Sequence, residues 1–179
     1  MRLKSNFCGI FATAFIVTTT FVCAYAGSGF DLTNLPGILA DARTDVNNLL
    51  GIMTEQYAQA MAIAIALDLY CKSEGIELTF VGHSLGGGLA AIASIVTGCT
   101  AITYNPAALS PATVLYLKIA GYGYDTSHIY RYIMDGDPIT KYQGMESEGT
   151  RKNVHNYTHG KAHDISTMIN NISPDLHLQ

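Results

Sequence analysis

Apolar residues in this chain gather in blocks, and the make-up of each block predicts the element that it forms. Short runs rich in β-branched and aromatic residues predict strands at residues 76–82, 99–105 and 127–134. Longer runs rich in alanine and leucine predict helices at residues 54–75, 84–98 and 110–121. Strands that alternate with helices in this way predict an α/β fold, with a mostly parallel sheet and helices on both faces.

Residues at the ends of these blocks support the predicted boundaries. Thr54 is placed to cap the first helix and Gly75 to end it. Pro111 suits the first turn of the third helix, because its missing N–H needs no partner there. Upstream, the glycines and proline of residues 27–36 predict a loop. Residues 37–51 predict either a short helix or an irregular segment.

Residues 1–26 fit two interpretations. Arg2 and Lys4 precede an apolar stretch that ends in Ala-Tyr-Ala, as in a secretory signal peptide, and the protein would then be secreted; otherwise it would be soluble. Alternatively, residues 10–17 and 21–26 form two buried strands, which also look like continuous apolar runs. Without them only about three strands remain, a small sheet for an α/β domain. We therefore favour strands.

Composition and charge narrow the classes of protein that the chain can belong to. Its 179 residues are 49% hydrophobic and only 13% charged, which predicts one globular domain over residues 1–179 with a buried core. The net charge of −4 and the lack of a basic run argue against binding to nucleic acid. The four cysteines form no C-x-x-C pair, and the histidines and acids show no ligand spacing. We expect neither a metal nor a cofactor.

The stretch FVGHSLGGGLA, residues 80–90, carries the clearest chemical motif. Its G-x-S-x-G pattern places Ser84 between a predicted strand and a predicted helix. Glycines two residues before and after the serine permit the sharp turn that exposes a nucleophilic hydroxyl. The helix N-terminus behind the serine offers free N–H groups, so Leu85 is a candidate oxyanion-hole donor. We expect a nucleophile here rather than a turn made only for close packing.

The longer stretch TFVGHSLGGGLAAIAS resembles the G-H-S-L-G-G-x-L-A elbow of the class 3 (fungal-type) lipases and their bacterial phospholipase-like relatives. The resemblance covers roughly residues 10–170 and is carried chiefly by this elbow. It implies an α/β-hydrolase fold in a compact or truncated version. It also implies a Ser-Asp-His ester hydrolase that acts on lipids or other carboxylic esters.

In such hydrolases the acid and then the base follow the serine along the chain. Asp135 and Asp137 both come directly after a predicted strand. The resemblance favours Asp137, because its Asp-Pro-Ile is similar to the family's Asp-Pro-Val, and leaves Asp135 second. Four histidines follow, and the family carries its histidine in a loop before a final helix. This favours His163 as the base, with His159 second.

The family takes a second oxyanion donor from the loop after an earlier strand. Residues 25–28, Tyr-Ala-Gly-Ser, resemble the family's Phe-Arg-Gly-Ser with alanine in place of arginine, so Ser28 is the candidate donor. Cleavage after Ala26 would remove the strand that positions Ser28. This is a second reason to favour strands over a signal peptide.

The sequence thus predicts a serine carboxylic-ester hydrolase, a lipase or phospholipase, which forms an acyl-serine intermediate. The alternatives are a thioesterase or acyltransferase on the same scaffold, or a non-catalytic binding protein with a hydrolase fold. We expect a lipid or another small ester as substrate and a transient contact with a lipid surface. The predicted loop at residues 141–161 is placed to line or cover the site.

Overall fold

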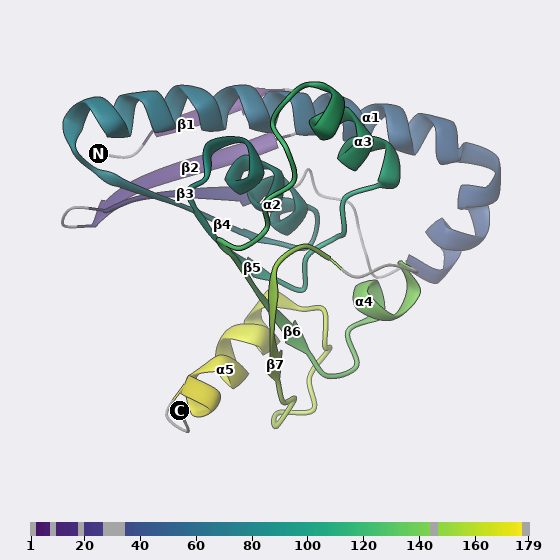
Figure 1. Ribbon diagram of the computed structural model, residues 1–179. Helices are drawn as coiled ribbons and strands as arrows, with labels where there is room; N and C mark the ends of the chain where they lie inside the picture. The colour runs from purple at the N-terminus through teal and green to yellow at the C-terminus, as the bar shows by residue number, and fades with distance from the viewer. Residues whose placement is uncertain (1–2, 8–9, 18–19, 27–34, 144–146, 177–179) are drawn as a thin grey trace.

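The computed structural model describes residues 3–7, 10–17, 20–26, 35–143 and 147–176. Its centre is one sheet of seven strands that lie side by side in the order in which they occur in the chain (Figure 1). The first two pairs of strands are antiparallel and the remaining four pairs are parallel. The strands are β1 (Leu3–Phe7), β2 (Ile10–Val17), β3 (Thr20–Ala26), β4 (Glu77–His83), β5 (Thr100–Tyr104), β6 (Ile129–Met134) and β7 (Thr150–Val154).

Within these described ranges, five helices connect or follow the parallel strands. They are α1 (Leu35–Glu74), α2 (Leu85–Thr97), α3 (Pro111–Ile119), α4 (Pro138–Tyr142) and α5 (Ile165–Leu176). In Figure 1, α1 runs across the top of the view, and α5 lies near the bottom, beside β6 and β7. The boundaries of β4, α2, β5, α3 and β6 agree with the sequence prediction to within about two residues at each end.

The N-terminal residues form strands, as the strand interpretation predicts for residues 10–17 and 21–26. β3 pairs in parallel with β4, for example Cys23 with Phe80, and so joins these residues to the core of the sheet. β1 was not predicted, because Leu3–Phe7 reads Leu-Lys-Ser-Asn-Phe, with three polar residues in a row and no apolar alternation typical of a strand. No helix in the described part of the chain is both long and apolar enough to cross a membrane.

The prediction that a helix begins at Thr54 is wrong, because Thr54 lies inside the continuous helix α1. Residues 37–51 are part of the same helix, so neither a separate short helix nor an irregular segment describes them. Pro36 sits in the first turn, where proline is tolerated, and the residues after it include no further proline. Gly51 alone costs only about 1 kcal/mol relative to alanine, too little to end a helix. Gly75 follows the helix with a φ of 66°, as a C-terminal glycine should.

Helices cover both faces of the sheet, as the sequence predicts. Cys23, Phe80, Ala101 and Ile129 form one row across neighbouring strands, and their side chains are buried in a core that includes residues of α1 and α2. On the opposite face, a smaller cluster joins the ends of β6 and β7 to Met168 of α5. α2 is buried along most of its length, which explains why its sequence is apolar or small on every side.

The carboxyl ends of β4, β6 and β7 lie at one edge of the parallel sheet and lead into the segments that carry the candidate site residues. The predicted loop at residues 141–161 is wrong in part, because α4 extends to Tyr142 and β7 lies within the remainder. β7 reads Thr-Arg-Lys-Asn-Val and only its last residue is buried, so its sequence lacks the apolar pattern of a strand.

Candidate active site

Ser84 stands on the turn between β4 and α2 with a strained backbone, at φ 57° and ψ −124°. The turn is so tight that a Cβ atom on Gly82 would lie 2.0 Å from the carbonyl oxygen of Gly86. Only glycine fits at position 82, because the nearest atoms belong to the backbone and cannot swing away. The first glycine of the G-x-S-x-G motif is therefore a steric requirement of this turn.

Hydrogen bonds fix the backbone of Ser84 on both sides. Its N–H donates to the carbonyl of Tyr104 at 3.1 Å, at the end of β5. Its own carbonyl accepts from the N–H groups of Gly87, Gly88 and Ala107, at 3.0, 3.2 and 2.9 Å. These bonds join the turn to α2 and to the segment after β5, so the hydroxyl is held in one place.

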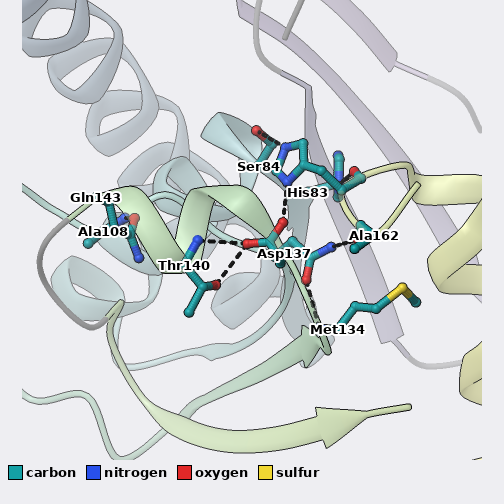
Figure 2. Close-up of polar contacts among 10 residues, drawn as sticks. His83, Ser84, Ala108, Met134, Asp137, Thr140, Gln143 and Ala162 are labelled. Atoms are coloured by element: carbon teal, nitrogen blue, oxygen red, sulfur yellow. Dashed lines mark hydrogen bonds and ion pairs between the residues drawn. The ribbon is translucent and has the colours of Figure 1, made fainter. Parts of the chain in front are cut away.

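Asp137 lies after β6, and its side chain is completely buried. The two oxygens of its carboxylate bond to different partners. Oδ2 accepts hydrogen bonds from the N–H and the hydroxyl of Thr140, at 2.7 and 2.8 Å, and so caps the short helix α4. Oδ1, the oxygen that does not bond to Thr140 (Figure 2), is 2.6 Å from His163 Nδ1.

His163 lies in the segment between β7 and α5 and connects the other two residues. Its Nδ1 is 2.6 Å from Asp137 Oδ1, and its Nε2 is 2.9 Å from Ser84 Oγ. An ionised carboxylate only accepts hydrogen bonds, so the ring nitrogen that faces it carries the proton. Nε2 is then free to accept the proton of the serine hydroxyl.

The structure brings Ser84, Asp137 and His163 together and leaves the second choices outside this cluster. Asp135 pairs with His155 instead, at 2.8 Å, and both side chains are more than half exposed. His159 lies in a turn, where its N–H donates to the carbonyl of Asn156. No hydrogen bond in the described part of the chain joins His159 to Ser84 or Asp137.

Of the two candidate oxyanion donors, Leu85 lies within the described residues and Ser28 does not. Leu85 is the first residue of α2, so its N–H belongs to the first turn, where amides lack an acceptor within the helix. Leu85 directly follows Ser84 in the chain. Ser28 lies outside the described residues, and its role stays a prediction.

Sequence reasoning missed three side chains that hold this cluster. Thr140 bonds to Asp137, as described above, while His83 and Asn105 bond to the backbone of the segment that carries His163. His83 is the last residue of β4 and Asn105 directly follows β5, and that position was the one available clue. Within the described part of the chain, no three His, Cys, Asp or Glu side chains gather in a way that could hold a metal ion.

A serine on a strained strand–helix turn, bonded to a histidine that is bonded to a buried carboxylate, defines the chain as an α/β-hydrolase-like protein. This arrangement can raise the nucleophilicity of a hydroxyl, which is the requirement for acyl transfer. More particularly, the chain belongs to the phospholipase-like family described as the Tle-like phospholipase domain, whose model matches residues 5–177. The resemblance to bacterial phospholipase-like proteins is thereby confirmed.

One relative also agrees with this assignment. The chain is 34% identical over 142 residues to the extracellular phospholipase A1 of Serratia liquefaciens. The match covers 77% of this chain and 43% of that protein, so the chain spans less than half the length of this relative.

Two solved structures are also similar. One is a mutant of MDLA from Penicillium cyclopium, with 16% identity, a TM-score of 0.46, and coverage of 86% of this chain and 62% of that one. The other is the mono- and diacylglycerol lipase from Aspergillus oryzae, with 18% identity, a TM-score of 0.41, and coverage of 80% and 57%.

Proposed function

We propose that this chain hydrolyses carboxylic esters of lipids through an acyl-serine intermediate, with Ser84 as nucleophile, His163 as general base and Asp137 as the acid that orients it. The observation that carries the proposal is the continuous hydrogen-bonded chain from Ser84 Oγ to His163 Nε2 and from His163 Nδ1 to Asp137 Oδ1. Three residues from distant parts of the sequence meet in the order and at the distances that proton transfer requires.

In the first half of the reaction, Ser84 Oγ attacks the ester carbonyl while its proton passes to His163 Nε2. The carbonyl oxygen becomes an oxyanion that the N–H of Leu85 is placed to stabilise, with Ser28 as the proposed second donor. Asp137 stabilises the imidazolium that forms. His163 then gives the proton to the leaving alcohol, and the acyl group remains on the serine.

In the second half, a water molecule gives a proton to His163 Nε2 and attacks the acyl carbonyl. The second tetrahedral intermediate collapses, the proton returns to Ser84 Oγ, and a carboxylic acid leaves. The burial of Asp137 and most of His163 keeps bulk water away from this proton path, which strengthens the electrostatic interactions along it.

Phospholipids are the proposed substrate class, because the chain belongs to a phospholipase-like family and its Serratia relative is named a phospholipase A1. The chain covers less than half of that relative, so the proposal concerns the chemistry of this domain. Substrates of this class are presented by membranes or micelles, and we therefore propose a transient contact with a lipid surface.

The test compares wild type with Ser84→Ala on phosphatidylcholine vesicles and on p-nitrophenyl acyl esters. We expect Ser84→Ala or His163→Ala to lower kcat by up to about 10⁶-fold, and Asp137→Asn by about 10⁴-fold. The matched controls are His159→Ala and Asp135→Asn, whose side chains lie outside the hydrogen-bonded cluster.

Hydrolysis that survives Ser84→Ala would exclude this serine as the nucleophile. If the wild-type protein cleaves neither substrate at any acyl length, the proposed ester-hydrolase activity is refuted. If an added alcohol or thiol accepts the acyl group in preference to water, the protein is an acyltransferase and not a hydrolase.

A further inference from the structure

The segment that carries His163 is held by its backbone as well as by the imidazole ring. His83 Nε2 is 2.8 Å from the carbonyl oxygen of His163. The side-chain amide of Asn105 donates to the carbonyl of the preceding residue, Ala162, also at 2.8 Å. Two consecutive carbonyls are therefore fixed by side chains from two different strand ends, which restricts both the position and the tilt of this peptide.

Asn105 connects this segment to the turn that carries Asp137. Its Oδ1 accepts from the N–H of Met134 at 2.9 Å, and the carbonyl of Met134 accepts from the N–H of Asp137 at 3.1 Å. The side chain has no exposed surface and its backbone has a φ of 41°, a conformation that asparagine tolerates better than most residues. One buried amide thus spans the two segments that must bring His163 and Asp137 together.

His83 connects the segment that carries His163 to the turn that carries Ser84, because it directly precedes Ser84 in the chain. A carbonyl oxygen only accepts hydrogen bonds, so His83 Nε2 carries the proton that is shared with the carbonyl of His163. Burial lowers the pKa of His83 below its ordinary value, and the nearby His163 lowers it further, which favours the neutral ring. Neutrality matters because the two rings lie 4.8 Å apart, and His163 becomes charged during the proposed reaction.

We propose that His83 and Asn105 are positioning residues that set the two distances of the triad, His83 between Ser84 and His163, and Asn105 between His163 and Asp137. The proposal rests on the proposed function for its effect on turnover. Neither residue contacts the reacting atoms, so both act through the backbone of the segment at residues 162–163.

The first experiment compares His83→Gln with His83→Asn. Glutamine can present its side-chain amide near the position of Nε2, whereas asparagine, one methylene shorter, cannot reach the carbonyl of His163. We expect His83→Gln to keep most of the wild-type kcat and His83→Asn to lose about 10²-fold, with KM little changed, because this is the cost of misplacing a catalytic group by about 1 Å.

The second experiment removes the donor of Asn105. Asn105→Asp keeps the acceptor for Met134 but presents no N–H to Ala162, and Asn105→Gly accepts the backbone conformation while removing both bonds. Both should lower kcat more than they raise KM. Because burying a carboxylate could unfold the first variant, circular dichroism of both variants accompanies the kinetics, and the glycine variant carries the test if the aspartate variant fails to fold.

A readout independent of turnover separates failure of this proposal from failure of the proposed function. The Nδ1 proton of His163, in a short bond to Asp137, should give a low-field NMR resonance that moves or broadens in His83→Asn and in the Asn105 variants, but not in His83→Gln. Equal losses in both His83 variants, or wild-type kcat and resonance in His83→Asn, would overturn the role of His83. Wild-type behaviour of a folded Asn105 variant would overturn the role of Asn105.

Discussion

Replacing Gly82 with alanine perturbs the turn under Ser84 without touching any member of the proposed triad. An alanine Cβ would lie 2.0 Å from the carbonyl oxygen of Gly86, 2.3 Å from its carbonyl carbon and 2.7 Å from the nitrogen of Gly87. Non-bonded atoms settle near 3.5 Å, so the end of β4 and the start of α2 must separate by at least about 1 Å. Overpacking of this kind typically costs about 1–3 kcal/mol of stability.

The same displacement has a calculable effect on activity. Ser84 lies between the two segments that separate, and its Oγ is 2.9 Å from His163 Nε2. A shift of about 1 Å takes this pair beyond hydrogen-bonding distance. Misplacement on this scale costs about 10²-fold in rate, so we expect Gly82→Ala to lower kcat by at least that factor in a fatty-acid release assay.

Gly98→Ala is the matched control, because Gly98 ends the same helix at its opposite end. It has a φ of 75° and nothing within 4 Å of an added Cβ, so alanine there is strained but does not clash. We expect a loss of about 1 kcal/mol, or roughly 2–4 °C in Tm, with kcat unchanged. If Gly82→Ala behaves like this control, with a lowered Tm and full kcat, the steric account of the elbow is refuted.

Three further predictions concern stability. Tyr57→Phe should raise Tm, because the buried hydroxyl of Tyr57 has no hydrogen-bond partner among the described residues and removing it relieves a penalty of about 1–2 kcal/mol; an unchanged or lower Tm would contradict this. Thr140→Val should lower the free energy of unfolding by about 1–2 kcal/mol, since one of the two bonds to Asp137 Oδ2 is lost, and urea denaturation should show recovery in Thr140→Ser. The pKa of His83 is lowered in the folded protein, so its contribution to stability is complete above about pH 6.5 and is lost as the pH falls towards the folded pKa. His163, Asp137 and Asp164 are the titratable groups around it, and urea denaturation between about pH 7 and pH 5 should show a smaller fall in stability in His83→Gln than in wild type.

The sequence was sufficient to predict the central part of the fold, because there each local preference agrees with the final structure. The strand before Ser84 is apolar, the turn holds glycines where a Cβ would clash, and α2 is small and apolar on all sides because it is buried. Ser84 was named from its motif and its place between a strand and a helix, while the resemblance to the class 3 lipases favoured Asp137 and His163. Each follows or leads into an element whose end is clear in the sequence.

Other features escaped prediction for two physical reasons. α1 was predicted to begin at Thr54 because threonine often caps helices, yet a helix continues wherever nothing interrupts it, and Gly51 is a weak interruption. The contacts of His83 and Asn105 lie across 80 and 57 residues of chain, and local patterns carry no information about such pairs. Of the two aspartates after β6, the burial of Asp137 and the exposure of Asp135 depend on the folded chain.

The strands lie in the sheet in the order in which they are synthesised, so the residues of the proposed site are also completed one after another. Each parallel strand pairs with the one made just before it, so the sheet can grow from the N-terminal side as the chain emerges. Ser84 and its elbow belong to the earlier part, Asp137 follows, and His163 arrives only after β7 has been made. A nascent chain that has completed the nucleophile therefore still lacks its base. In the proposed mechanism, ester hydrolysis is therefore withheld until the segment after β7 has been translated.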